Sequence, residues 1–251
     1  MKPSESKLFT EIINAAISIA PDTEIKLPIT DTFVLGSYWR SISLFRGVVE
    51  LLKSNLSEEA LILSRSLFTE SMRLMEISQA DKRRGSLILG WANQSYNEIK
   101  GLFLEAHRLG LDPDAEKVVT HYEQQQQKLQ NYARRHSVGR FGKFRPEGDA
   151  AKRFGRQDDY WTFLLSHAMV HGSDAAYVFR RKKIGESAIT LFPNTNDPAI
   201  VASVGIFAAK SLLDGAKATA QIFSWSLPAH FDSFYERLES LVERKDTGGI
   251  T

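Results

Sequence analysis

Residues 57–78 read SEEALILSRSLFTESMRLMEIS, and the spacing of their apolar side chains decides the expected fold. Ser57 is suited to cap a helix, and Glu58 and Glu59 favour the positive end of its dipole. A helix with two apolar stripes has neighbours on two sides, so we expect a central helix of a bundle. At helical periodicity one stripe contains Leu61, Phe68, Met72 and Met75, and the other contains Leu63, Leu67 and Leu74.

The rest of the chain has the same helical periodicity. Gly110 ends one helix, and Asp112-Pro113 precedes the next. We predict an all-α fold, a multi-helix bundle of seven or eight helices with at most a small β-hairpin near residues 183–193. The expected organisation is a single helical domain over residues 1–251, with an N-terminal helix and loop at 1–30 and a basic loop at 138–157. Helices are expected at 4–20, 31–52, 57–78, 81–110, 114–136, from 158 through the histidine segment, 198–225 and 228–245.

The composition excludes several classes of chemistry. The 251 residues include no cysteine, which excludes disulfide scaffolds, thiol nucleophiles and cysteine-ligated metals. Motifs of the HExxH, Glu-x-x-His, Walker and GxGxxG kinds are also absent. No apolar run approaches the roughly 20 residues of a membrane span. Charged residues interrupt the apolar opening segment, so no signal peptide is expected, and we predict a cytoplasmic protein with no membrane partner.

A second informative stretch, residues 164–177, reads LLSHAMVHGSDAAY. The spacing of His167 and His171 places both on one face of a helix with Asp174, on an apolar strip expected to face the core. Two imidazoles and a carboxylate are suitable ligands for a divalent transition metal such as zinc, manganese or iron. Alternatively, one histidine is a general base oriented by the acid, or both are core histidines bonded to backbone carbonyls. The spacing leaves all three interpretations open.

The polar sector of residues 57–78 contains two further candidates. Arg65 and Glu70 lie at opposite edges of this sector, and either side chain can reach inward. The alternative for Glu70 is a solvated pair with Arg73, three residues later, which contributes roughly 0.2–0.5 kcal/mol.

Two short motifs, RSLFTE at residues 65–70 and LLSHAMVHGS at residues 164–173, resemble those of a family of uncharacterised bacterial helical proteins, known only as a domain of unknown function. That family pairs an arginine and a glutamate with a Ser-x4-His-Gly segment. The matching residues here are Arg65, Glu70, Ser166 and His171. The resemblance runs from about residue 31 to the end of the chain, and it implies that Arg65, Glu70 and His171 converge inside the bundle as a catalytic set.

More distantly, the chain resembles the HEPN-like helical bundles of toxin and phage-defence systems. Nucleases of that group carry an arginine followed four to six residues later by a histidine on one helix. None of the six histidines of this chain follows an arginine at that spacing, so the resemblance does not extend to ribonuclease activity. His167 is also outside the family pattern, which weakens the metal hypothesis.

Basic residues concentrate between positions 131 and 156. This segment contains eight lysines and arginines but only two acids, Glu147 and Asp149, which gives it a formal charge of +6. The other 225 residues have a formal charge of −4. The bases alternate with phenylalanines at 141, 144 and 154, a pattern in which cations bind phosphates while rings stack on bases. We predict that this 134–156 basic loop binds nucleic acid or another polyanion. The alternative is a solvated loop whose phenylalanines anchor it on the bundle. The candidate ligand-binding residues are Arg140, Lys143, Arg145, Ser166 and Ser173.

Three functional hypotheses fit these patterns. The first is a protein that engages nucleic acid or phosphate, of a defence or toxin–antitoxin kind, with a polar site inside the bundle. The second is a metal-dependent hydrolase that uses the His167/His171 helix. The third is a non-catalytic interaction protein whose polar cluster is structural. Whether any reaction is catalysed stays open, and a homodimer through the small-residue-rich helix at 203–223 is a further candidate interaction.

Overall fold

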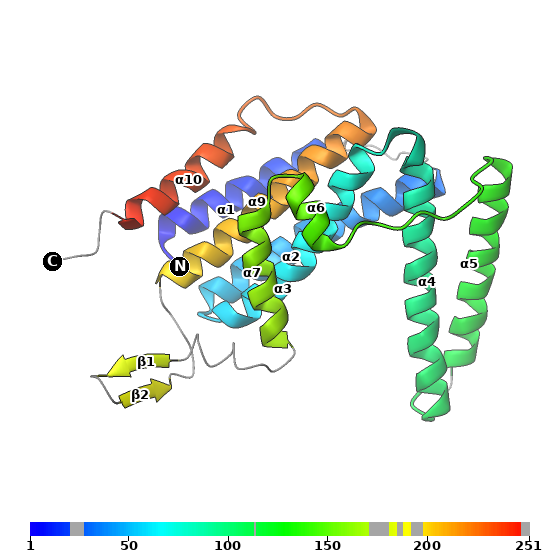
Figure 1. The fold of residues 1–251 in the computed structure, drawn as a ribbon, viewed down its shortest axis with the longest axis horizontal. Coiled ribbons are helices and arrows are strands. Elements are labelled where there is room, and N and C mark those ends of the chain that lie inside the picture. Colours follow the sequence, from blue (N-terminus) through cyan, green and yellow to red (C-terminus); the bar gives the residue numbers. More distant parts are fainter. Residues whose placement is uncertain (21–27, 113, 171–180, 185–187, 192–197, 247–251) are drawn as a thin grey trace. The chain divides into compact units, whose positions relative to one another are not determined.

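The computed structural model describes residues 1–20, 28–112, 114–170, 181–184, 188–191 and 198–246. Within them lie nine α-helices, one 3-10 helix and a two-stranded sheet, so the predicted all-α fold is confirmed (Figure 1). For the basic loop the sequence predicts irregular structure with at most a short helix, and the seven-residue α6 is that helix. The elements are α1 (Pro3–Ile19), α2 (Ile29–Lys53), α3 (Ser57–Ser78), η1 (Asp81–Arg83), α4 (Arg84–Arg108), α5 (Ala115–Arg135), α6 (Glu147–Arg153), α7 (Gln157–Val170), β1 (Arg181–Ile184), β2 (Ala188–Leu191), α9 (Pro198–Phe223) and α10 (Ser233–Asp246).

The chain divides into two compact units. Unit 1 comprises residues 1–25, 35–75 and 146–251, and unit 2 comprises residues 26–34 and 76–145. The basic loop is therefore shared, with residues 138–145 in unit 2 and residues 146–157 in unit 1. The single domain expected from the sequence stays a prediction.

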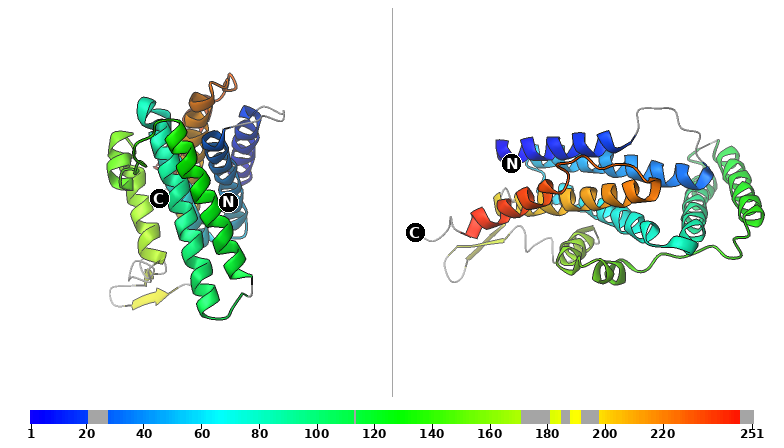
Figure 2. Two further views of the ribbon diagram at one scale, coloured as in Figure 1. Left: turned by 90° about the vertical axis from the view of Figure 1, so that its right-hand side faces the viewer. Right: turned by 90° about the horizontal axis from the view of Figure 1, so that it is seen from above.

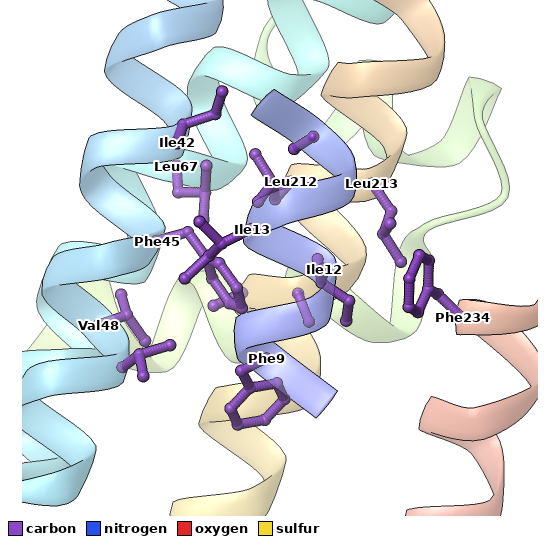
Figure 3. Packing of buried hydrophobic residues seen from close by; sticks show 14 of the residues in the cluster. Phe9, Ile12, Ile13, Ile42, Phe45, Val48, Leu67, Leu212, Leu213 and Phe234 are labelled. Carbon is purple, nitrogen blue, oxygen red and sulfur yellow. The ribbon is translucent and has the colours of Figure 1, made fainter. Parts of the chain in front are cut away.

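Unit 1 is built around one apolar core. Phe9 and Ile12 of α1 meet Phe45 of α2, Leu212 of α9 and Phe234 of α10, all of them buried (Figure 3). Burying a side chain of this size contributes about 1.5–3 kcal/mol relative to leaving it in water. The core therefore holds segments from both ends of the chain together.

Helix α9 is the small-residue-rich helix that the sequence offered as a dimer surface. Its side chains are buried on nearly all sides, and a Cβ atom at Gly205 would lie 2.6 Å from Cζ of Phe9. The small residues therefore serve close packing of α9 on α1, and α9 does not present a free face for a second copy. Among the helices that the structure describes, none is long and apolar enough to cross a bilayer.

Helix α3 has neighbours on two sides, as its two apolar stripes predict. Leu61 and Leu67 belong to the main core of unit 1. Phe68 and Met72 belong to a second cluster, with Phe163 of α7 and Phe207 of α9. Because both clusters are buried, the prediction of a central helix is confirmed.

Unit 2 consists mainly of an antiparallel hairpin of α4 and α5, which lie side by side in both views (Figures 1 and 2). A small apolar cluster joins them, formed by Leu89 and Ala92 of α4 and by Leu129 and Ala133 of α5. Further along, the amide of Gln126 donates to the Asn97 side chain at 2.8 Å. The α4/α5 interface thus combines apolar packing with a side-chain hydrogen bond.

Several helices end in the same backbone motif. After α4, Gly110 has a φ of +68°, and its amide and that of Leu111 bond back to the carbonyls of His107 and Ala106. This is the Schellman arrangement, in which a left-handed residue satisfies the last carbonyls of a helix. The predicted end of the fourth helix at Gly110 is confirmed. Helix α5 ends in the same way, with Ser137 in place of a glycine.

The strand-like run predicted near residues 183–193 forms a two-stranded antiparallel hairpin. Arg181 pairs with Leu191, and Ile184 pairs with Ala188. The hairpin is the only sheet among the described residues, and it leaves the helical class of the fold unchanged.

Candidate functional site

The histidine segment was expected to turn its His167 strip towards the core. Among the α7 side chains that the structure describes, Phe163 and Ser166 are buried, whereas Leu164, on the predicted strip, is 38% exposed. Phe163 packs against Phe68 of α3 with ring planes tilted by 39°, and Tyr160, on the predicted strip, is half-buried against the same cluster. Leu164 thus marks the exposed edge of the strip, and the orientation expected for His167 stays a prediction. The hydroxyl of Ser166 donates to the carbonyl of Phe163 at 2.6 Å and is fully buried, so it is already bonded within its own helix.

The side chains of the predicted metal ligands are outside the part of the chain that the structure describes. His171, Ser173 and Asp174 lie outside the described residues, and so does the side chain of His167. In the part of the chain that is described, no group of three or more histidine, aspartate or glutamate side chains is arranged to hold a metal ion. The metal hypothesis and the roles of these four residues stay predictions.

Arg65 and Glu70 of α3 have different neighbours. The guanidinium of Arg65 lies over the ring of Phe163 in α7, 5.5 Å from its centroid. The carboxylate of Glu70 accepts a 2.5 Å hydrogen bond from the hydroxyl of Ser37 in α2. Arg65 thus contacts α7 and Glu70 contacts α2, and no ion pair joins these two side chains, since Glu70 is paired with Arg40 and Arg73.

Glu70 is the centre of a buried polar cluster. Glu70 is 6% exposed, and one guanidinium nitrogen of Arg40 and one of Arg73 each lie 3.9 Å from its Oε1 atom. A buried carboxylate without such partners would be strongly destabilising. The interpretation of Glu70 and Arg73 as a solvated surface pair is therefore wrong: Arg73 is one of three groups that compensate a buried charge.

A second buried network in unit 1 was missed by the sequence reasoning. Arg156, counted there as part of the basic loop, is 9% exposed and forms ion pairs with Asp159 of α7 and Asp214 of α9. The phenol of Tyr235 in α10 donates to Asp214 at 2.7 Å. Burial raises the pKa of Tyr235, the charge of Arg156 opposes that rise, and Asp232 adds to it. The available signal was Asp214, an isolated carboxylate in the apolar helix α9.

Arg145, a predicted ligand-binding residue, already has a partner inside unit 2. Both its backbone amide and its guanidinium donate to the carboxylate of Glu76, at 3.0 and 2.9 Å. The Glu76 side chain is only 5% exposed, so Arg145 neutralises a buried acid. This pair holds the end of the basic loop, and Arg145 is not a free cation for a ligand.

The phenylalanines of the basic loop are anchored, which confirms the alternative that the sequence offered for their rings. Phe144 packs edge-on against Trp91 of α4, with ring centroids 5.7 Å apart. Phe141 packs on the α4/α5 cluster of unit 2, and Phe154 packs on the second cluster of unit 1. Between the first two rings, the amide of Gly142 donates to the carbonyl of Ser86 at 2.8 Å. These rings are therefore not free to stack on bases.

Six exposed cations of unit 2 gather at one end of the α4/α5 hairpin, which we name the basic end. Antiparallel pairing places the start of α4 beside the end of α5, and the hydroxyl of Ser86 donates to the carbonyl of Arg140 at 2.7 Å. None of the exposed cations at this end forms an ion pair with a described residue. The basic end comprises Lys82, Arg83, Arg134, Arg135, Arg140 and Lys143.

Lys82 and Arg83 were missed by the sequence reasoning, which considered only the basic loop. They belong to the run DKRRG at residues 81–85, next to the N-terminus of α4. Cations are disfavoured at a helix N-terminus by about 0.3–1 kcal/mol each, and the first turn of α4 contains no acid. The placement of these bases is therefore not explained by helix stability.

Charge is unevenly distributed within unit 2. The unit contains 13 lysines and arginines against 9 aspartates and glutamates, a formal charge of +4 in a chain whose total is +2. Residues 76–91 and 131–145 carry eight of these bases and two of these acids, so the remainder of the unit is slightly negative. At that other end, Arg108 and Lys117 are paired with Glu105 and Asp114. The unpaired positive charge is concentrated at the basic end.

Comparison with known proteins gives no relative to set beside this geometry. No protein-family model matches the chain, and no curated protein or solved structure matches it either. The resemblance of its two motifs to a helical family, and more distantly to HEPN-like bundles, therefore stays a prediction, and function is argued from the residues themselves.

Proposed function

We propose that this protein binds nucleic acid or another polyanion through the basic end of unit 2. The observation that carries the proposal is the group of six exposed cations, drawn from two segments distant in sequence, none with an ion-pair partner among the described residues. Lysine and arginine side chains that neutralise phosphates release condensed counterions, which is the main source of sequence-independent affinity for nucleic acids. A surface of this kind binds phosphates regardless of base identity.

The rigid backing of the basic end supports the proposal. Arg140 and Lys143 flank the backbone of Gly142, which is bonded to α4, while Arg145 is bonded to Glu76. Cations on an anchored backbone lose less conformational freedom on binding than cations on a solvated loop. The phenylalanines contribute by holding the loop, not by contacting the ligand.

The Glu70 cluster has a structural role in this proposal. Its carboxylate is buried and occupied by Ser37, Arg40 and Arg73, which leaves no acceptor positioned for a ligand. The protein thus binds without the catalytic set that the family resemblance implies. That resemblance extends the proposal to a cytoplasmic bacterial protein of the defence or toxin–antitoxin kind.

Binding of labelled oligonucleotides and of inorganic polyphosphate, measured by fluorescence anisotropy or competition across a range of salt concentrations, tests this function. The double variant Arg140→Gln/Lys143→Gln should weaken binding and reduce the slope of log K against log salt by roughly 1.4–1.8, given about 0.7–0.9 per lost phosphate contact. The matched control is Arg108→Gln/Lys117→Gln, which removes the same charge from the paired end of the same hairpin. The control should leave the slope almost unchanged.

Two outcomes would overturn the proposal. One is wild-type protein that binds no polyanion in a salt-dependent manner. The other is an equal loss of affinity in both double variants, because binding would then reflect net charge and not the basic end. Arg145→Gln separates anchoring from binding: it should lower the free energy of unfolding through the loss of the Glu76 pair, with a smaller effect on the salt slope than Arg140→Gln.

A further inference from the structure

One aromatic pair at the basic end has one ring packed on a core cluster and the other ring exposed. The rings of Tyr132 and His136 stack with centroids 4.1 Å apart and an interplanar angle of 30°. Tyr132 is half-buried against the α4/α5 cluster, whereas His136 is exposed. Among the described residues Tyr132 provides the one ring contact of His136, and His136 is exposed; we call the imidazole face turned away from Tyr132, which meets no other described ring, the open face.

The backbone holds this ring pair in place. His136 is the C-cap residue of α5, and its amide donates a hydrogen bond to the carbonyl of Tyr132 at 3.0 Å. The Schellman motif that follows bonds Val138 back to Ala133 at 2.9 Å, and Val138 packs on the same cluster as Tyr132. The exposed imidazole is therefore preorganised by its helix and by the ring beneath it.

Arginines flank His136 in the sequence, at the end of α5 and in the loop that follows. Arg134 and Arg135 immediately precede His136, and Arg140 follows it after the left-handed turn at Ser137. Proteins that bind single strands combine a positively charged surface for the backbone with flat rings on which bases stack. Inside a duplex both faces of each base are covered by its neighbours, so apart from the two terminal pairs it is an unpaired strand that offers base faces to such a ring.

We infer that the ligand of the basic end is a single-stranded nucleic acid and that one of its bases stacks on the open face of His136. This inference rests on the proposed function and adds the class of ligand and the residue that recognises it. The aromatic contact comes from Tyr132 and His136, and not from the three phenylalanines of the basic loop, whose rings are occupied. The phosphates on either side of the stacked base are bound by the neighbouring arginines.

The test compares the binding of three ligands at one fixed pH and salt concentration. They are a single-stranded oligonucleotide, a blunt duplex of the same sequence and inorganic polyphosphate, which has no bases. His136→Ala should weaken binding of the single strand about tenfold, an effect typical of losing one base-stacking contact, and leave polyphosphate binding unchanged. His136→Phe, which keeps a flat ring, should retain single-strand affinity.

The matched control is His121→Ala, another exposed histidine on α5, whose ring meets Tyr122 edge-on. It should leave all three affinities unchanged. The inference is overturned if His136→Ala changes all three ligands equally or not at all, if His136→Phe behaves like the alanine variant, or if duplex binds as tightly as single strand. Polyphosphate binding that persists in those cases leaves the proposed function standing, whereas wild-type protein that binds none of the three removes both.

Discussion

Gly90 and Gly142 approach so closely that a Cβ atom at Gly90 would lie 1.9 Å from the carbonyl oxygen of Gly142. The contact seats the backbone of the basic loop directly on α4. Only glycine permits this, because any side chain at position 90 would occupy the space of the loop. The exposed Arg140 and Lys143 therefore extend from a fixed backbone.

Gly90→Ala should lower the free energy of unfolding by about 1–3 kcal/mol, the usual cost of inserting atoms into a packed contact. Gly85→Ala is the control on the same helix: a Cβ there meets no atom within 4 Å, so the higher helix propensity of alanine should add up to about 1 kcal/mol. Urea unfolding of both variants measures the difference. If Gly90→Ala stabilised the protein as Gly85→Ala does, the close approach of the loop would be refuted.

Ser37→Ala should destabilise the protein more than Arg65→Ala does. Removing the Ser37 hydroxyl leaves the buried Glu70 carboxylate without its 2.5 Å donor, which costs about 1–3 kcal/mol. Removing Arg65 loses a cation–π contact of about 0.5–1 kcal/mol. Unfolding free energies from urea titrations establish the order, and anisotropy should show unchanged polyanion binding in Ser37→Ala. Reduced binding in a Ser37→Ala protein that is otherwise folded would contradict a purely structural cluster.

Ser137→Gly should stabilise the protein by about 1 kcal/mol. Ser137 occupies the left-handed position of a Schellman motif, with a φ of +55°, where a side chain is disfavoured and glycine is not. Ser137→Ala is the control, since alanine keeps the Cβ and should give no gain. Thermal unfolding of the three proteins measures the effect. Equal stability of the glycine and alanine variants would show that the turn is not strained.

Stability should fall at alkaline pH through Tyr38. Its phenol donates a 2.5 Å hydrogen bond to the carbonyl of Ala16, and burial raises its pKa above the ordinary tyrosine value of about 10. Below about pH 10 the phenol is protonated in both the folded and the unfolded protein, so this contribution is complete. Above that pH only the unfolded chain ionises, and stability declines by up to about 1.4 kcal/mol per pH unit.

Tyr38→Phe removes the titrating group and should flatten this decline between pH 9 and pH 11, although it lowers stability at neutral pH through the lost hydrogen bond. Urea unfolding at several pH values gives the two slopes. A residual slope is expected because burial also raises the pKa of Tyr235 and of Tyr96. Identical slopes in wild type and variant would refute the role of Tyr38.

The sequence by itself determined the helical class, the central position of α3 and the end of α4 at Gly110. These features depend on local information: the spacing of apolar side chains along one helix, and the backbone preferences of glycine and proline. It also located the excess of positive charge and offered anchoring as an alternative role for the loop phenylalanines. Each of these follows from residues that are neighbours in the chain.

Only the tertiary structure decided which polar groups are free and which are already paired. Arg145 and Glu76 are 69 positions apart, and Ser37 and Glu70 are 33 apart, so no local spacing predicts either pair. The pairing of α4 with α5 likewise added Lys82 and Arg83 to the basic end, and the packing of α7 on the second cluster buried Phe163. The physical reason is that burial creates the need for a partner, and burial depends on which helices pack together.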